Sequence, residues 1–188
     1  MDYPNLFRNL PMLRTERLSL RPLRIQDAND IFAYASDPEV SRYTTWETHP
    51  NLDVSLGYIH YVQSRYLDGL PDTWGIILNS TDHLVGTVGL LNFEEQAKHI
   101  ELGYVVAPQH QSQGIATEAA NLAMDYAFGP LGLNKVSACC FAENHASERV
   151  MLKLGMRYEG TVRDHIWKRG SLHDVKLYGK LAKECGAS

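Results

Sequence analysis

The sequence lacks the motifs of several common functional classes. It has no G-x-x-x-x-G-K-[ST] loop and no G-x-G-x-x-G segment, which argues against a P-loop NTPase and a dinucleotide-binding protein. No apolar run approaches the ~20 residues of a membrane span, and the N-terminus lacks the basic and apolar regions of a signal peptide. We therefore predict no membrane partner. The eight histidines show no H-E-x-x-H or comparable ligand spacing, so we also predict no metal site.

Basic residues and cysteines are also few. The formal net charge of −4 argues against a nucleic-acid partner, because phosphate backbones are bound by clustered Lys and Arg. The adjacent Cys139 and Cys140 and the distant Cys185 form neither a disulfide framework nor a metal-ligand pattern. We therefore expect a protein of the reducing cytoplasm.

The composition is that of a globular protein, with 44% hydrophobic and 21% charged residues. The 188 residues are expected to form a single domain, 1–188, with a sizeable core. Periodicity predicts a mixed α/β layer fold in the order β-α-α-β-β-β-α-β-α-β-β, after a lead-in over residues 1–14. The expected strands are 15–23, 73–78, 84–92, 100–106, 135–142, 156–167 and 174–183. The expected helices are 28–35, capped by Asp27, and 53–69, 115–127 and 145–154.

One strand–loop–helix segment has the chemistry of an anion site. The strand Ile100–Val106 ends at Pro108, which cannot donate to a sheet, and helical spacing begins at Ile115. The polar loop between them places free backbone N–H groups at a helix N-terminus, where the helix dipole favours a phosphate. Gly114 and Ala116 are small where a ligand has to approach the backbone closely.

Two motifs in this part of the chain resemble those of one family. The segment Gln111–Ala116 (Gln-Ser-Gln-Gly-Ile-Ala) resembles the [QR]-x-x-G-x-[GA] loop of the GCN5-related N-acetyltransferases (GNATs), which holds the pyrophosphate of acetyl-CoA. The segment Asn144–Met156 resembles the family's N-x-x-[SA]-x(5)-K-x-G-[FM] motif. It occurs where the family has it, one strand after the helix that begins at Ile115. The resemblance covers nearly the whole chain and implies a GNAT fold, with a central, mostly antiparallel twisted sheet and helices on both faces.

Three further segments narrow the resemblance. Leu13–Pro22, Glu101–Tyr104 and Gly114–Ala119 resemble the ribosomal-protein N-terminal alanine and serine acetyltransferases. That branch also contains members that act on small or toxic amines. The resemblance therefore implies an acetyl-CoA-dependent N-acetyltransferase, active as a monomer or homodimer. Its acceptor is a protein N-terminus or a small amine such as an amino-acid derivative, a polyamine or an antibiotic.

Glu101 is the candidate general base. Acetyl transfer requires a neutral amine, and a base at the amine accelerates such reactions by roughly 10²–10⁴. Strand alternation places Glu101, Gly103 and Val105 on one face, and the family implies a glutamate on this strand as the base. The alternative is a solvated carboxylate or a cross-strand partner of a Lys or Arg.

Ser147 is the candidate acid for the departing thiolate. Some relatives carry a tyrosine seven residues after the helix asparagine, where this chain has Met151. The ribosomal-protein branch has a serine three residues after that asparagine, which is Ser147 here. Helical spacing places Ser147 and Met151 on one face. The family implies that Asn144 contacts the pantetheine or the thioester, whereas helix capping is the alternative for both Asn144 and Ser147.

The resemblance also assigns the residues that bind acetyl-CoA, whereas the acceptor-side residues are aromatic side chains that could line a groove near the thioester. Backbone groups of Val105 and Val106 are expected to pair with the pantetheine amides, as in sheet extension. The pyrophosphate is assigned to six loop residues: Gln111, Ser112, Gln113, Gly114, Ile115 and Ala116. Trp46 and Phe93 are the predicted acceptor-side residues.

Two alternatives concern mechanism and class. Cys139 and Cys140 lie in an apolar strand, so we expect core packing and direct attack of the amine, without a covalent enzyme intermediate. A non-catalytic acyl-CoA-binding module would keep the Gly114 loop but would not need Glu101 and Ser147.

Overall fold

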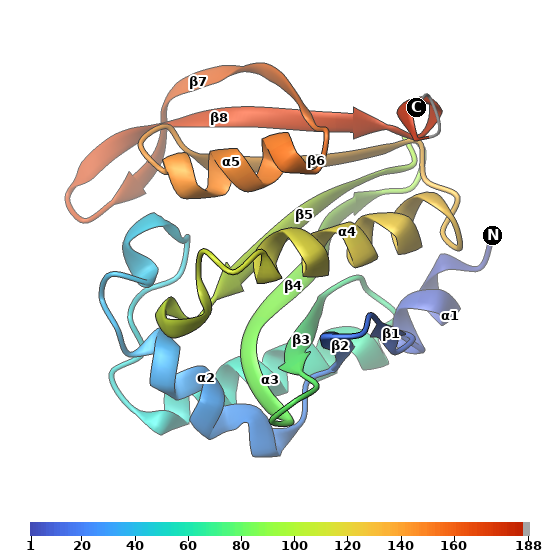
Figure 1. Cartoon of the computed structure of the whole chain (residues 1–188). Helices are drawn as coiled ribbons and strands as arrows, with labels where there is room; N and C mark the ends of the chain where they lie inside the picture. The colour runs from blue at the N-terminus through green and yellow to red at the C-terminus, as the bar shows by residue number, and fades with distance from the viewer. Residues whose placement is uncertain (186–188) are drawn as a thin grey trace.

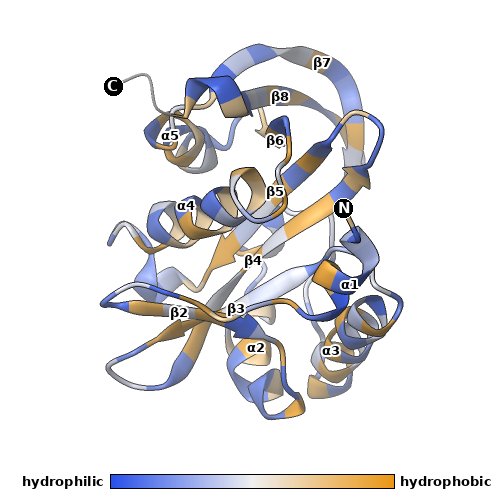
Figure 2. Ribbon diagram, turned by 90° about the vertical axis from the view of Figure 1, so that its right-hand side faces the viewer, coloured by the Kyte–Doolittle hydropathy of each residue, from blue (hydrophilic) through white to orange (hydrophobic). Residues whose placement is uncertain are grey.

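The computed structural model describes residues 1–185 and contains one eight-stranded sheet in the order β1-β2-β3-β4-β5-β6-β8-β7 (Figure 1). The strands are β1 (Leu13–Arg14), β2 (Leu18–Pro22), β3 (Thr73–Leu78), β4 (His83–Glu94), β5 (His99–Val106), β6 (Lys135–Phe141), β7 (Arg157–Lys168) and β8 (Ser171–Leu181). The helices are α1 (Tyr3–Arg8), α2 (Ala28–Ala35), α3 (Leu52–Leu67), α4 (Ile115–Phe128) and α5 (His145–Lys153). Helices α4 and α5 lie on one side of the sheet and α1 and α3 on the other (Figure 2). The predicted mixed α/β order is confirmed, with two additions before β2.

The lead-in before β2 contains these two additional elements. Helix α1 begins after Asp2, whose side chain accepts a hydrogen bond from the Asn5 N–H at 3.2 Å. A proline in the first turn also favours a helix start. Strand β1 pairs with β2 through Leu13 and Leu20. Periodicity missed both elements because α1 has only six residues and β1 only two.

Asp27 occupies the N-cap position of α2, as predicted, but the prediction that its side chain caps this helix is wrong, because the side chain makes no capping hydrogen bond. Its buried carboxylate accepts hydrogen bonds from both terminal nitrogens of the Arg21 guanidinium, at 2.7 and 2.8 Å. It also accepts the Arg24 backbone N–H at 2.7 Å, which closes the turn before the helix. The carboxylate turns to Arg21 because a buried guanidinium is stable only when it is paired.

A split in the middle of the sheet is the main feature of the architecture. Among the strands within residues 1–185, only β5 and β6 are parallel neighbours, and they pair over three positions. Glu101 and Ser137 form the last pair, although β5 continues to Val106 and β6 to Phe141. Beyond this point β5 pairs only with β4, and β6 only with β8. The two strands therefore separate, and the facing edges of their backbones lack a strand partner.

Helix α4 packs closely against the sheet because its inner face carries small side chains. The completely buried alanines of this face are Ala119, Ala120, Ala123 and Ala127. Trp74 of β3 contacts Tyr126 of α4 edge to face, with 5.7 Å between ring centroids, and its indole N–H donates to the Pro11 carbonyl at 2.9 Å. This packing holds the first turn of α4 next to the end of β5.

The Arg21–Asp27 pair generates a stability prediction. Asp27→Asn leaves the Arg21 charge without a counterion, and breaking such buried pairs costs about 3–5 kcal/mol of unfolding free energy. The exposed Glu39–Arg42 pair (3.3 Å) supplies the matched control, Glu39→Gln, with an expected cost below about 1 kcal/mol. Urea unfolding of the two variants measures the difference. Equal losses would contradict the structural importance of the buried pair.

Candidate active site

The loop before α4 presents free backbone donors. Gly114 is the N-cap of α4 and adopts a left-handed conformation (φ 80°, ψ −1°), and Ser112 also has a positive φ of 60°. The Gln111 side chain fixes the loop by donating to the Val106 carbonyl at 2.9 Å. Within residues 1–185, the backbone N–H groups of Ser112, Gln113 and Gly114 donate no hydrogen bond. Together with the start of α4, these groups supply the free backbone donors that the predicted anion site requires.

Ile115 and Ala116 contribute to this loop through the backbone. The Ile115 side chain is buried in the core, so only its N–H faces the loop. Ala116 is half-buried and starts the first turn of α4. Because one side chain is buried and the other is only a methyl group, neither covers the backbone of the loop.

Arg17 lies beside this loop, and sequence reasoning missed it. Its guanidinium donates to the Gln113 carbonyl at 3.3 Å and pairs with Glu118 in the first turn of α4. The Thr15 hydroxyl donates to the other Glu118 oxygen. A Cβ atom at Gly114 would lie 3.7 Å from an Arg17 nitrogen. Arg17 and Glu118 therefore tie the start of β2 to the loop, a link that no local pattern in either segment indicates.

Glu118 does more than complement the helix dipole. Burial alone would raise the pKa of its carboxyl, but the hydrogen bond from Thr15 and the pairing with Arg17 outweigh it and lower the pKa. The carboxylate is therefore ionised whenever the loop is formed at neutral pH.

A hydroxyl pair lies on the α5 side of the split. The Asn144 side chain caps α5 by accepting a hydrogen bond from the Ser147 N–H at 3.1 Å, which is the helix-capping role given above as the alternative for Asn144. The Ser147 hydroxyl lies 3.0 Å from the hydroxyl of Tyr104 on β5. Tyr104 also donates to the Ser147 carbonyl at 3.0 Å, and burial raises the pKa of its phenol. Met151 is completely buried, so the position of the relatives' tyrosine is part of the core here.

Tyr104 is the second residue that sequence reasoning missed. Alternation placed it correctly on the face opposite Glu101, but only the contact between β5 and α5 brings its hydroxyl to Ser147.

Glu101 lies on the other face of β5, at the narrow end of the split. Its carboxylate accepts hydrogen bonds from the Asn92 side chain at 2.8 Å and from the Cys139 thiol at 3.4 Å. Asn92 has a positive φ of 49° and lies at the irregular end of β4, which aims its side chain at Glu101. No Lys or Arg within residues 1–185 forms an ion pair with Glu101, so the cross-strand alternative does not apply to the described part of the chain.

The two adjacent cysteines have different environments. Cys140 is buried, as expected, whereas Cys139 is exposed, so the prediction of core packing is wrong for Cys139. A β-strand turns neighbouring side chains to opposite faces, and the Cys139 face is not covered. Desolvation and the Glu101 carboxylate raise the pKa of the Cys139 thiol to about 12, so it is a neutral hydrogen-bond donor.

Two glycines lie on the face of the sheet next to Glu101. Gly103 pairs with Gly89 on this face, and a Cβ atom at Gly103 would approach only Leu91, at 3.4 Å. Val105 pairs with Thr87. Burial raises the pKa values of the Tyr34 and Tyr58 phenols beside Thr87, and the Thr87 hydroxyl offsets only part of this rise. Backbone groups of Val105 and Val106 lie where β5 borders the split.

The two predicted acceptor-side aromatics lie in different surroundings. Phe93 packs against Tyr3 and Phe7 of α1, with 4.7 and 5.2 Å between ring centroids, and thus belongs to the core near the N-terminus. Trp46 is half-buried between α2 and α3, and its carbonyl accepts a hydrogen bond from Lys168 at 2.7 Å. Only Trp46 therefore remains a candidate for acceptor contact.

Within residues 1–185 no helix is long and apolar enough to cross a membrane, and no three His, Cys, Asp or Glu side chains gather as metal ligands.

The sequence model of the acetyltransferase (GNAT) domain matches residues 17–157. The uncharacterized N-acetyltransferase YoaA of Bacillus subtilis is 34% identical over 168 residues, which are 89% of this chain and 95% of YoaA.

Solved structures agree with this match. A GNAT-family acetyltransferase from Bacillus anthracis superposes with a TM-score of 0.83 at 26% identity, over 92% of this chain and 99% of that one. RimL, a ribosomal L7/L12 alpha-N-protein acetyltransferase in complex with coenzyme A, shares the fold, with a TM-score of 0.83 at 16% identity over 91% of this chain and 98% of RimL. The chain belongs to the GNAT family of acetyltransferases, which use acetyl-CoA, and is an N-acetyltransferase.

Proposed function

We propose that this enzyme transfers the acetyl group of acetyl-CoA to a protein N-terminus by direct attack of the amine on the thioester. The observation that carries the proposal is the arrangement around β5. Glu101 lies on one face of the strand, and the Tyr104–Ser147 hydroxyl pair lies on the other. The free N–H groups of the loop before α4 lie beyond the end of the same strand.

The loop and the split suit the donor substrate. The pyrophosphate would accept hydrogen bonds from the free N–H groups of Ser112, Gln113 and Gly114, in a loop that Arg17 holds through the Gln113 carbonyl. From Val106 back to Glu101 the strand spans about 17 Å at ~3.3 Å per residue, which gives the pantetheine arm an edge to pair with. The thioester would then lie near the narrow end of the split, close to Glu101.

Glu101 would accept the proton of the attacking amine, directly or through water. Asn92 holds its carboxylate by a hydrogen bond of 2.8 Å. The new N–C bond forms as the C–S bond breaks, and the departing sulfur takes a proton from the Ser147 hydroxyl. Tyr104, 3.0 Å away, positions that hydroxyl and returns a proton to it from solvent. The proton lost by the amine balances the proton gained by the thiol.

The state of Cys139 supports direct attack. A thiol must ionise to act as a nucleophile, and the pKa of Cys139 is raised to about 12. The thiol therefore stays protonated at neutral pH and donates to Glu101, so an acetyl-cysteine intermediate is disfavoured.

Charges on the acceptor side favour a singly charged amine. Glu47 is neutralised by Lys168 at 2.7 Å, so it offers no free carboxylate to the second charge of a polyamine. The names of relatives differ on this point: YdaF of Bacillus subtilis, 34% identical over 101 residues, is named for ribosomal N-acetylation. The spermidine N(1)-acetyltransferase of Escherichia coli is 26% identical over 162 residues, so a small amine is the second candidate.

Coenzyme A release with peptides that begin in Ala, Ser or Met, and with a panel of small amines, tests the acceptor. We expect turnover of a peptide, and Glu101→Gln is expected to lower kcat/KM by about 10²-fold or more, since a base contributes roughly 10²–10⁴. The loop variant Glu95→Gln should match the wild type. Turnover of small amines alone would establish the second candidate. Coenzyme A binding without any turnover would indicate a binding module instead.

Gly114→Trp is expected to weaken coenzyme A binding by at least about 100-fold, or about 2.8 kcal/mol, because the side chain would occupy the phosphate position. Gly170→Trp is the matched control, because Gly170 has nearly the same φ (82° against 80°) but lies in the β7–β8 turn. Calorimetric titration of both variants with coenzyme A gives the comparison. Unchanged affinity in a folded Gly114→Trp variant would refute the loop assignment.

Tyr104→Phe and Ser147→Ala should each lower kcat by about 10- to 100-fold, and the double variant should lose little more, because residues that act as a unit are not additive. Tyr158→Phe, which removes an exposed hydroxyl bonded to Thr161, is the control and should retain kcat. Steady-state kinetics at saturating acetyl-CoA measures these effects. Losses that multiply in the double variant would mean that the two hydroxyls act independently.

A further inference from the structure

Lys168 at the end of β7 is almost completely buried, with 3% of its side chain exposed. Its ammonium donates to the Trp46 carbonyl and to the Glu47 carboxylate, each at 2.7 Å. Burying an ammonium is costly unless it is paired and hydrogen-bonded, so these two bonds are what hold it in this position. Both partners belong to the same segment, residues 36–51 between α2 and α3, which we call the strap.

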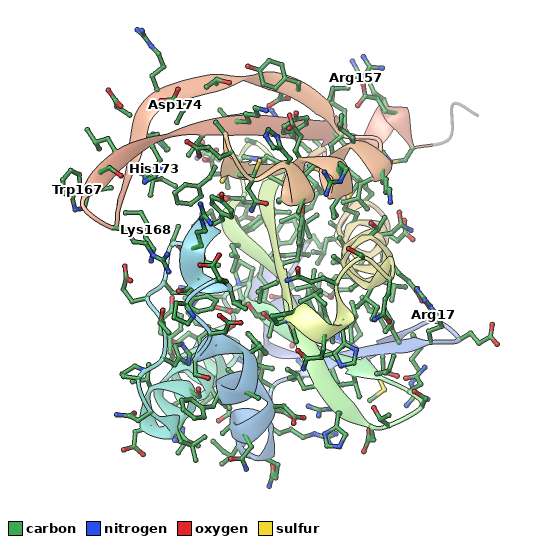
Figure 3. The ribbon with its side chains drawn as sticks, turned by 60° about the vertical axis from the view of Figure 1, so that its left-hand side comes forward. Arg17, Arg157, Trp167, Lys168, His173 and Asp174 are labelled. Atoms are coloured by element: carbon green, nitrogen blue, oxygen red, sulfur yellow. The ribbon has the colours of Figure 1, made fainter. Side chains whose placement is uncertain are left out.

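The strap is attached at both of its sides. At its base, the His49 N–H donates to the Ala35 carbonyl at 2.9 Å and the His49 ring bonds the Ser55 hydroxyl at 2.8 Å. At its outer side, Arg169 donates to the Pro38 carbonyl, next to the Lys168 contacts. Figure 3 shows Lys168 extending from the β7–β8 hairpin to this segment. The strap therefore connects the α2–α3 layer with the β6–β8 half of the sheet.

These two parts of the molecule are the ones that the split separates. Tyr43 of the strap contacts Phe141, the last residue of β6, with 5.9 Å between ring centroids. Helices α2 and α3 cover the β4–β5 part of the Glu101 face, since buried Tyr34 of α2 and half-buried Tyr58 of α3 lie beside Thr87 on that face, whereas the β6 part around Cys139 is uncovered. The strap thus crosses the wide end of the split on the side of Glu101, opposite the side of Ser147.

We propose that Lys168 is a positioning residue for the acceptor: it fixes Trp46 and Glu47 of the strap across the acceptor side of the split. The inference rests on the proposed function. An amine that reaches Glu101 from this side passes the strap, whereas acetyl-CoA is held by the loop before α4 and by β5. Loss of Lys168 therefore impairs acceptor binding and leaves donor binding intact. It also frees the Glu47 carboxylate, which then favours doubly charged amines.

The first test is kinetic. Lys168→Met is expected to raise KM for the acceptor by about 10- to 100-fold, the size of effect that misplacement causes. KM for acetyl-CoA should stay within about twofold, because the loop before α4 and β5, which are proposed to hold acetyl-CoA, are not part of the strap. Lys168→Arg should restore part of the acceptor KM. The control is Lys135→Met, which breaks another 2.7 Å ion pair, with Glu159, in the same half of the sheet. Equal rises of both KM values in Lys168→Met, or equal effects in the control, would overturn the proposal.

The second test does not depend on activity. Arg42 lies on the strap and is half-exposed, so trypsin can cleave there once the strap is released. We expect faster cleavage after Arg42 in Lys168→Met than in the wild type and in Lys135→Met. Equal cleavage rates would show that Lys168 does not hold the strap. If Lys168→Met does not fold, Arg169→Ala, which removes only the bond to Pro38, should show the same changes to a smaller extent. If the wild type turns over no amine, the proposed function fails, while the cleavage rates still decide whether Lys168 holds the strap.

Discussion

The parallel pairing of β5 and β6 stops at Glu101 and Ser137, and the rest of the site depends on this limit. Each strand keeps a partner on its outer edge, β4 or β8, so the sheet remains intact while its centre opens. Unpaired backbone edges of a sheet attract another chain or ligand with amide groups. The opening therefore leaves backbone donors and acceptors available for the pantetheine arm that we propose to bind there, and the two halves of the sheet hold the groups at its borders.

Each border of the split is fixed by contacts distant in sequence. Arg17 of the lead-in to β2 binds the loop before α4, which keeps the free N–H groups of this loop at the end of β5. Tyr104 joins β5 to α5 through Ser147. Lys168 joins the β7–β8 hairpin to the strap. Strand β5 separates the proposed base, Glu101, from the proposed proton donor, the Tyr104–Ser147 pair, because alternation directs Glu101 and Tyr104 to opposite faces.

Much of the fold was predictable from local patterns. The alternation and helical spacing gave the order of the elements after β2, because each long element buries one face. Helix α1 and strand β1 were not predicted, because elements of six and two residues are too short to show a periodic pattern. Asp27 had the sequence of a cap, but the buried Arg21 competes for its carboxylate and wins because an unpaired buried charge costs more than a lost cap. Phe93 was placed near the acceptor, yet α1 covers its ring.

The sequence by itself determined the family resemblance, the anion loop around Gly114 and the faces of β5, because these depend on residues close together in the chain. Gly114 in its left-handed conformation illustrates this, since a local turn demands that residue type. Only the tertiary structure decided which side chains distant in sequence meet around the split. Arg17 and Glu118 are separated by 101 positions, Tyr104 and Ser147 by 43, and Lys168 and Glu47 by 121. No local periodicity encodes such pairs, because they form only when the helices and strands pack.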